Sequence, residues 1–192
     1  MADTQDLLKD VTKTRESIDR FEISASEVQK NYTQYIATLL DSIMIMPTMV
    51  EDRDDRNYIQ AISYLSSAKE NLAQIRAILQ EILISKTLSK ENFIHAKESV
   101  KIYHTAIKRF DKSLNEYPEF LNSYKNSFKN SAIQETFDIV DLLDKNSDEL
   151  FNIDSEHWFK TESKSIDAHK EVQQKLFIYA NNSIDKKIKQ AN

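Results

Sequence analysis

The chain contains no glycine among its 192 residues, and this absence restricts the possible folds more than any other feature. Glycine supplies the backbone angles that tight hairpin turns, Rossmann-type folds and phosphate-binding loops require. Sandwiches, barrels and nucleotide folds built on such turns are therefore excluded. Cysteine is also absent, which removes disulfides, thiolate zinc sites and a cysteine nucleophile. The fold class that remains is all-α.

The composition favours a soluble chain. Charged residues make up 30% and apolar residues 40%, and the formal net charge is −5, which is too apolar for a disordered chain and too charged for a membrane protein. The most apolar stretch, residues 36–50, contains Asp41 and Pro47 and is shorter than the ~20 residues that span a bilayer. The polar start lacks the pattern of a signal peptide. We expect no transmembrane segment and a cytoplasmic location.

Apolar residues recur every three or four positions through most of the chain, as is typical of helical bundles and coiled coils. The pattern predicts long helices over residues 4–46, 54–86, 89–129 and 131–190. The expected architecture is a single domain over residues 1–192, an elongated antiparallel bundle of four long helices with coiled-coil-like heptad seams.

Three interruptions are expected. Pro47 ends the first helix, because proline lacks the backbone N–H. The apolar rhythm continues through Pro118, so we expect a kink in a continuous third helix; the alternative is a new helix with Pro118 in its first position. Residues 146–154 are expected to break the last helix in two. The second helix should be the most buried, along the seam Tyr58, Ala61, Leu65, Ala68, Leu72, Ile75, Leu79 and Ile82.

No pattern for catalysis or metal binding is present. A di-iron bundle needs Glu-x-x-His motifs on two helices, and no glutamate stands three residues before any of the four histidines, His95, His104, His157 and His169. We expect all four at the surface. No catalytic triad or paired carboxylate is recognisable. The sequence thus predicts a protein that is not an enzyme and holds no metal or cofactor.

Five lysines lie along one side of the third helix and have two interpretations. They could dock phosphates or anionic lipid, or form a solvated face beside acidic neighbours, which is the favoured interpretation. Nucleic acid is an unexpected partner, because the chain as a whole is acidic. The five residues are Lys90, Lys97, Lys101, Lys108 and Lys112.

Two surfaces are candidates for binding a partner. The apolar stripe of the first helix is narrow up to residue 31, so either a second chain or the C-terminal segment of the same chain could cover it. The methionine-rich segment 44–50 could form an adaptable apolar surface, or seal one end of the core. The candidate contact residues are Leu7, Val11, Ile18, Phe21, Met46 and Met49.

These features favour a non-enzymatic interaction or assembly protein that binds a protein partner or itself through helix seams. One alternative is a small-molecule-sensing bundle with a pocket among its aromatic residues. Another, less favoured, is a peripheral protein of a lipid or granule surface, using residues 44–50 and the lysines. The pattern resembles long-helix bundles such as sensor domains, secretion chaperones, phasin-like coat proteins and assembly adaptors, and no motif selects among them.

Overall fold

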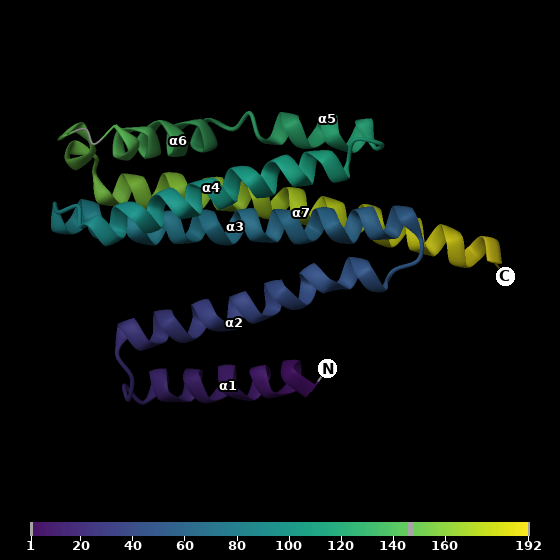
Figure 1. The fold of residues 1–192 in the computed structure, drawn as a ribbon, viewed down its shortest axis with the longest axis horizontal. Helices are drawn as coiled ribbons and strands as arrows, with labels where there is room; N and C mark the ends of the chain where they lie inside the picture. The colour runs from purple at the N-terminus through teal and green to yellow at the C-terminus, as the bar shows by residue number, and fades with distance from the viewer. Residues whose placement is uncertain (1, 146–147, 192) are drawn as a thin grey trace. The chain divides into compact units, whose positions relative to one another are not determined.

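The computed structural model describes residues 2–145 and 148–191. Within these ranges the chain forms seven α-helices and two short 3-10 helices, without a strand (Figure 1), so the predicted all-α class is confirmed. The chain divides into two compact units, residues 1–49 and residues 50–192, and each is described by itself. No helix in the described ranges is both long enough and apolar enough to span a bilayer.

The smaller unit is a helical hairpin rather than the continuous helix predicted over residues 4–46. It consists of α1 (Ala2–Asp19), α2 (Ala25–Ile45) and the 3-10 helix η1 (Met46–Met49). The chain reverses direction between α1 and α2, and these two helices pack against each other. A contact of 2.8 Å between Thr14 Oγ1 on α1 and Tyr35 Oη on α2 joins them.

The turn after α1 explains why the apolar rhythm misled. Phe21 adopts the left-handed region with φ of 57°, a conformation that helices use to end and that glycine usually occupies. The N–H of Glu22 donates to the carbonyl of Ser17 at 2.9 Å, and the N–H of Phe21 donates to that of Ile18, also at 2.9 Å. This is the Schellman pattern of a helix C-terminus. No glycine marks it in the sequence, so the helix end was not predicted.

The start of α2 did carry a sequence signal. Ser24 is its N-cap and forms a capping box with Glu27. The Glu27 N–H donates to Ser24 Oγ at 3.2 Å, while the Ser24 N–H donates to Glu27 Oε2 at 2.9 Å. The Ser-x-x-Glu spacing is a recognised start signal, and the heptad rhythm on both sides concealed it.

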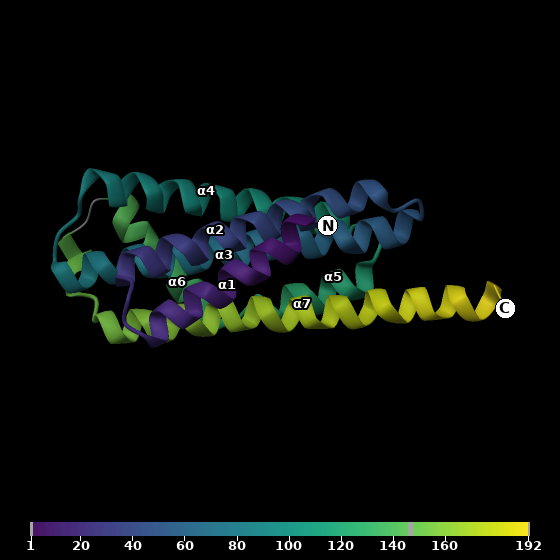
Figure 2. The same ribbon diagram turned by 90° about the horizontal axis from the view of Figure 1, so that it is seen from below.

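The larger unit is built around three long helices, α3 (Arg53–Ser85), α4 (Lys90–Ser113) and α7 (Ser155–Ala191). Figures 1 and 2 show α3 running beside both α4 and α7, and these are the most extensive packing contacts in the chain. The bounds of α3 match the prediction of residues 54–86. Every position of its predicted seam, from Tyr58 to Ile82, is buried.

The rest of this unit consists of shorter elements, α5 (Pro118–Ser127), α6 (Ser131–Asp144) and the 3-10 helix η2 (Asp148–Asn152). In Figure 1, α5 and α6 lie in one row alongside α4, and both contact α7. The predicted interruption near 146–154 is present, because η2 separates α6 from α7. Residues 146–147 themselves lie outside the described ranges.

The third predicted helix is divided at Pro118 rather than kinked. Helix α4 ends at Ser113, and α5 begins with Pro118 in its first turn, which is the alternative stated above. A proline ring clashes with the carbonyl four residues earlier and keeps the preceding residue out of the helical region. Tyr117 accordingly has φ of −120° and ψ of 67°. The segment 114–117, called here the α4–α5 linker, becomes a turn.

Two hydrophobic clusters fill the interior of the larger unit. Along α7, Trp158 belongs to one cluster and Val172 to the other, and buried polar residues lie between them. The Trp158 indole N–H donates to the carbonyl of Arg76 on α3 at 3.0 Å. These polar residues interrupt the apolar repeat of α7 at positions that are buried all the same.

Candidate functional site

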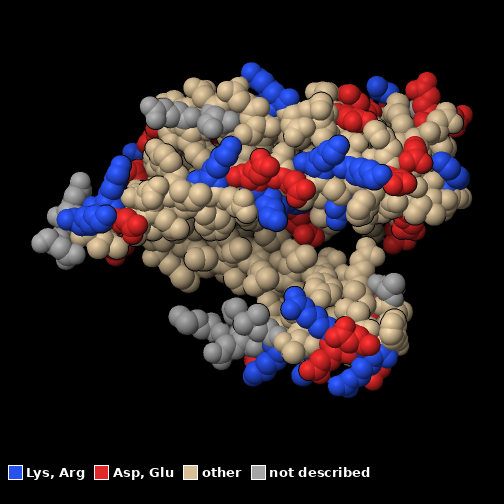
Figure 3. Space-filling model, turned by 180° about the vertical axis from the view of Figure 1, so that it is seen from behind, with Lys and Arg blue, Asp and Glu red and all other residues tan. Residues whose placement is uncertain are grey.

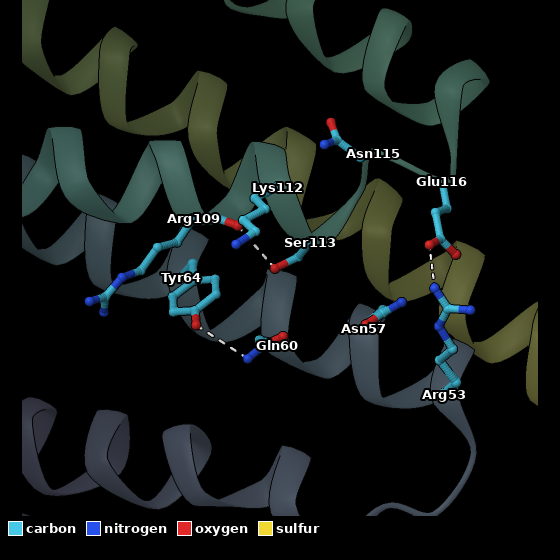
Figure 4. Close-up of a pocket in the computed structure, with 9 residues that line it drawn as sticks. All are labelled: Arg53, Asn57, Gln60, Tyr64, Arg109, Lys112, Ser113, Asn115 and Glu116. Carbon is cyan, nitrogen blue, oxygen red and sulfur yellow. Dashed lines mark hydrogen bonds and ion pairs between the residues drawn. The ribbon is translucent and has the colours of Figure 1, made fainter.

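One concave site of the larger unit is a groove between α3 and α4, with a volume of about 770 Å³. Ligand pockets commonly have volumes of ≈ 300–1,000 Å³. The residues from α3 are spaced by four, three and four positions and therefore share one helix face. Figure 4 shows the side chains that line the groove: Arg53, Asn57, Gln60 and Tyr64 from α3, Arg109, Lys112 and Ser113 from α4, and Asn115 and Glu116 from the α4–α5 linker.

The lining carries three cations and one carboxylate, which makes the groove electropositive in an acidic protein. Arg109 lies at one end, with its guanidinium carbon 5.8 Å from the centre of the Tyr64 ring. Arg53 lies at the other end, where its guanidinium forms an ion pair with Glu116 (Figure 4). Lys112 is in the last turn of α4. Opposing helices thus supply positive charge to one space.

Neutral hydrogen-bonding groups complete the lining. Gln60 Nε2 donates to Tyr64 Oη at 3.2 Å, and Ser113 Oγ donates to the backbone carbonyl of Arg109 at 3.0 Å. Asn57 and Asn115 contribute amide groups, whose NH₂ donates two hydrogen bonds. Cations with amide and hydroxyl donors around them are suited to an oxyanion rather than to a metal ion or an apolar ligand.

The α4–α5 linker is attached to the first turn of α3 beside the groove. Tyr117 Oη donates to Asp54 Oδ1 at 2.6 Å. Burial is the main cause that raises the pKa of Tyr117 to about 12, and the bond to Asp54 adds to it. The Tyr117 ring also packs 4.8 Å from the ring of Tyr58. The linker residues that line the groove are therefore held against α3.

A family model described as nitrate and nitrite sensing matches residues 1–177. The chain belongs to this nitrate- and nitrite-sensing family. The matched range includes every residue that lines the groove. No curated protein and no solved structure matches the chain. Family membership supports a small-molecule-sensing helical domain, which sequence analysis gave as an alternative to the interaction protein it favoured.

The predicted partner-binding residues do not form part of this groove. Leu7 is buried, Val11 and Ile18 are half-buried, and Phe21 is 94% exposed in the turn after α1. Met46 and Met49, in η1, are 48% and 76% exposed. The structure thus leaves Phe21 and Met49 as the most accessible members of the predicted set.

The groove was not predicted, because it lies beside the apolar seam of α3 and not along it. The polar stripe of α3 runs beside the seam, at positions that a bundle normally gives to solvent. Only the antiparallel pairing of α3 and α4 brings this stripe opposite Arg109 and Lys112. A usable signal existed, because the short turn after α3 predicts antiparallel helices, and this pairing places the polar face at the start of α3 opposite the cations at the end of α4.

The predicted lysine surface is exposed at all five positions along α4, and Lys112 at its end lines the groove. On the face of the larger unit seen in Figure 3, basic and acidic side chains are interleaved. In the described ranges no group of three or more His, Asp or Glu side chains is placed to hold a metal ion.

One histidine contradicts the expectation that all lie at the surface. His169 on α7 is fully buried, whereas the other three are exposed. His169 Nε2 lies 3.0 Å from Tyr103 Oη, and Nδ1 lies 2.7 Å from the carbonyl of Ser165. Burial lowers the pKa of His169 to about 4, so the ring is neutral at neutral pH.

A carboxyl group is also buried on α7, about two helical turns before His169. Glu162 on α7 is fully buried, and burial raises its pKa to about 8. Its Oε2 accepts a hydrogen bond from Thr136 Oγ1 on α6 at 2.6 Å. Both ionisable groups are held uncharged in the core, where charge would be costly. Glu162 belongs to the packing of α7 against α6, and His169 to the packing of α7 against α4, rather than to the groove.

Proposed function

We propose that this chain is a non-catalytic sensor domain that binds nitrate or nitrite in the groove between α3 and α4. The observation that carries the proposal is that two antiparallel helices line one groove with three cationic side chains, Arg53, Arg109 and Lys112. Membership of the nitrate- and nitrite-sensing family supports the same ligand class. Both anions are small and carry one negative charge on oxygen atoms.

The side chains have separable tasks in this proposal. A guanidinium presents N–H donors in a planar fork that can engage two oxygens at once, which suits a planar anion such as nitrate. Lys112 adds a compact charge that can rotate toward the anion. Asn57 and Gln60 amides donate to the remaining oxygens.

Binding would connect the two helices that form the groove. An anion held between Lys112 of α4 and the amide groups of Asn57 and Gln60 on α3 interacts with both helices together. A ligand shifts a conformational equilibrium only by its difference in affinity for the two states. We therefore expect nitrate to favour the arrangement in which the start of α3 and the end of α4 are closest.

The proposal is tested with charge-removing variants on one helix. Lys112→Gln removes a groove cation, and Lys108→Gln removes the same charge one turn earlier on α4, at an exposed position outside the groove. Nitrate should raise the melting temperature of wild type and Lys108→Gln through mass action. Lys112→Gln should need about 5- to 10-fold more nitrate for the same shift.

Sodium chloride at matched ionic strength serves as the reference, because it separates specific binding from screening. An equal response of Lys108→Gln and Lys112→Gln to nitrate would rule out this groove as the binding site. Equal effects of nitrate and chloride on wild type would rule out nitrate sensing.

Self-association is a second candidate, favoured by the large apolar side chains that the smaller unit exposes. Phe21 and Met49 are the clearest, and exposed apolar surface often marks an interaction site. Light scattering on wild type and on the double variant Ile18→Asp with Phe21→Asp measures this directly. A dimer that dissociates in the double variant, with helical circular dichroism intact, supports the candidate; an unchanged mass excludes it.

A further inference from the structure

We propose that Glu116 is a tethered competitor for the anion site, and that an incoming oxyanion displaces its carboxylate from Arg53 and releases the α4–α5 linker; this inference rests on the proposed function. Glu116 lines the groove and already pairs its carboxylate with the Arg53 guanidinium. A carboxylate and nitrate present oxygens to a guanidinium in the same way. The two anions therefore compete for one cation.

The ion pair between Arg53 and Glu116 is weak enough for an incoming anion to displace Glu116. The side chains of Arg53 and Glu116 are 70% and 58% exposed, and an exposed ion pair gains little in water. The nearby contacts of Lys187 on α7 with Asp52 and Asp55 at 2.6 and 2.9 Å are better shielded. Displacement should thus break the Glu116 contact and leave the attachment of α7 to α3 in place.

Release of Glu116 should affect the α4–α5 linker, because Glu116 is part of it. It lies in a four-residue linker between the end of α4 and Pro118, which starts α5. The linker is anchored at both ends, because Leu114 is fully buried and Tyr117 donates to Asp54 and packs on Tyr58. Loss of the Arg53 contact would therefore loosen the middle of the linker, at Glu116, between these two anchored residues.

The next turn of α3 also contacts α7 through aromatic side chains. Tyr58 lies 4.8 Å from the Tyr117 ring on the linker and 5.6 Å from the Tyr179 ring on α7. A shift of the linker changes the packing around Tyr58, which two elements share. Occupancy of the groove would in this way be communicated from α3 and α4 to α5 and α7.

Glu116→Gln tests the inference, because it removes the competing charge and keeps the side-chain shape. The control is Glu98→Gln, which removes the same charge at an exposed site on α4 outside the groove. Nitrate affinity is measured by titration calorimetry, and hydrogen exchange of residues 114–117 is measured with and without nitrate. Sodium chloride at equal ionic strength is the reference.

Glu116→Gln should bind nitrate about 2- to 10-fold more tightly than wild type and Glu98→Gln. Nitrate should speed exchange at residues 114–117 severalfold in wild type. In Glu116→Gln this exchange should already be fast and unaffected by nitrate. Binding by Glu116→Gln alone, with wild type below detection, would also support a competitor.

Two results would overturn the inference, and they differ in what they say of the proposed function. If wild type binds nitrate but Glu116→Gln matches it in affinity and linker exchange, the competitor role is wrong while the nitrate site stands. If neither protein binds nitrate, both the proposed function and the inference are wrong.

Discussion

Thr136 Oγ1 on α6 donates a 2.6 Å hydrogen bond to Glu162 Oε2 on α7, and both side chains are fully buried. This bond joins two helices inside the core through a carboxyl group that holds its proton. Arg76 is the cationic residue that acts against the effect of burial and lowers the pKa of Glu162, and Tyr103 on α4 lies near enough to interact with Glu162 electrostatically. The stability of the larger unit should therefore depend on pH.

Glu162→Gln should abolish an alkaline loss of stability. The pKa of Glu162 is about 8 in the folded chain against 4.5 for an ordinary glutamate. The folded state thus binds a proton that the unfolded state releases, and stability is lost progressively as pH rises from 4.5 to 8. The full loss is about 5 kcal/mol. Glutamine keeps an amide oxygen for Thr136 and has no proton to lose.

Urea unfolding followed by the fluorescence of Trp158, the single tryptophan, measures this effect in the larger unit. The wild-type free energy of unfolding should fall between pH 6.5 and 8.5, while that of Glu162→Gln stays level. Parallel curves for the two proteins would show that Glu162 does not titrate in this range.

Once Glu162 is replaced, His169 should determine how the free energy of unfolding changes below pH 6.5. Burial lowers the pKa of His169 to about 4 from an ordinary 6.5. The unfolded state therefore binds a proton that the folded state excludes, and stability is lost as pH falls from 6.5 through 4, by about 3 kcal/mol. In wild type the gain from Glu162 offsets this loss over the same range.

The clean measurement uses the Glu162→Gln background, with and without His169→Gln. Glu162→Gln alone should lose stability from pH 6.5 to 4, and the double variant should be flatter there. An acid loss that persists unchanged in the double variant would assign it to other groups.

Phe21→Gly should stabilise the helical hairpin of the smaller unit. Phe21 has φ of 57° and is 94% exposed, so glycine removes a steric penalty and loses little packing. Phe21→Ala is the matched control, because it removes the ring but keeps the Cβ that causes the strain. The Phe21→Gly hairpin should be more stable than the Phe21→Ala hairpin by about 1 kcal/mol. This difference should appear as slower hydrogen exchange in α1 and α2. Equal exchange in both variants would contradict this.

Helix periodicity predicted the parts of the fold that packing determines. The α3 seam from Tyr58 to Ile82 was identified because apolar burial and the 3.6-residue repeat agree there. The break at residues 20–24 was missed because Phe21 occupies a position that glycine normally marks. At Pro118, an unbroken apolar phase concealed a division that proline chemistry imposes.

The groove could not be predicted from the sequence of either helix alone, because residues of both helices line it. Asn57 and Gln60 look like ordinary solvated residues until α4 places Arg109 and Lys112 opposite them. The buried Glu162 and His169 were equally invisible, because polar residues on a helix are expected to face water. A single sequence predicts the apolar and the polar face of each helix. Which polar faces lie opposite each other depends on how the helices pair in the fold.

The most direct test of the account is a calorimetric titration of the full chain with sodium nitrate and sodium nitrite, against sodium chloride at constant ionic strength. We expect saturable binding of one anion per chain for nitrate or nitrite, weakened by Lys112→Gln and unchanged by Lys108→Gln. Nitrate and nitrite heats that do not differ from those of chloride would contradict the assignment of the α3–α4 groove as an anion sensor site.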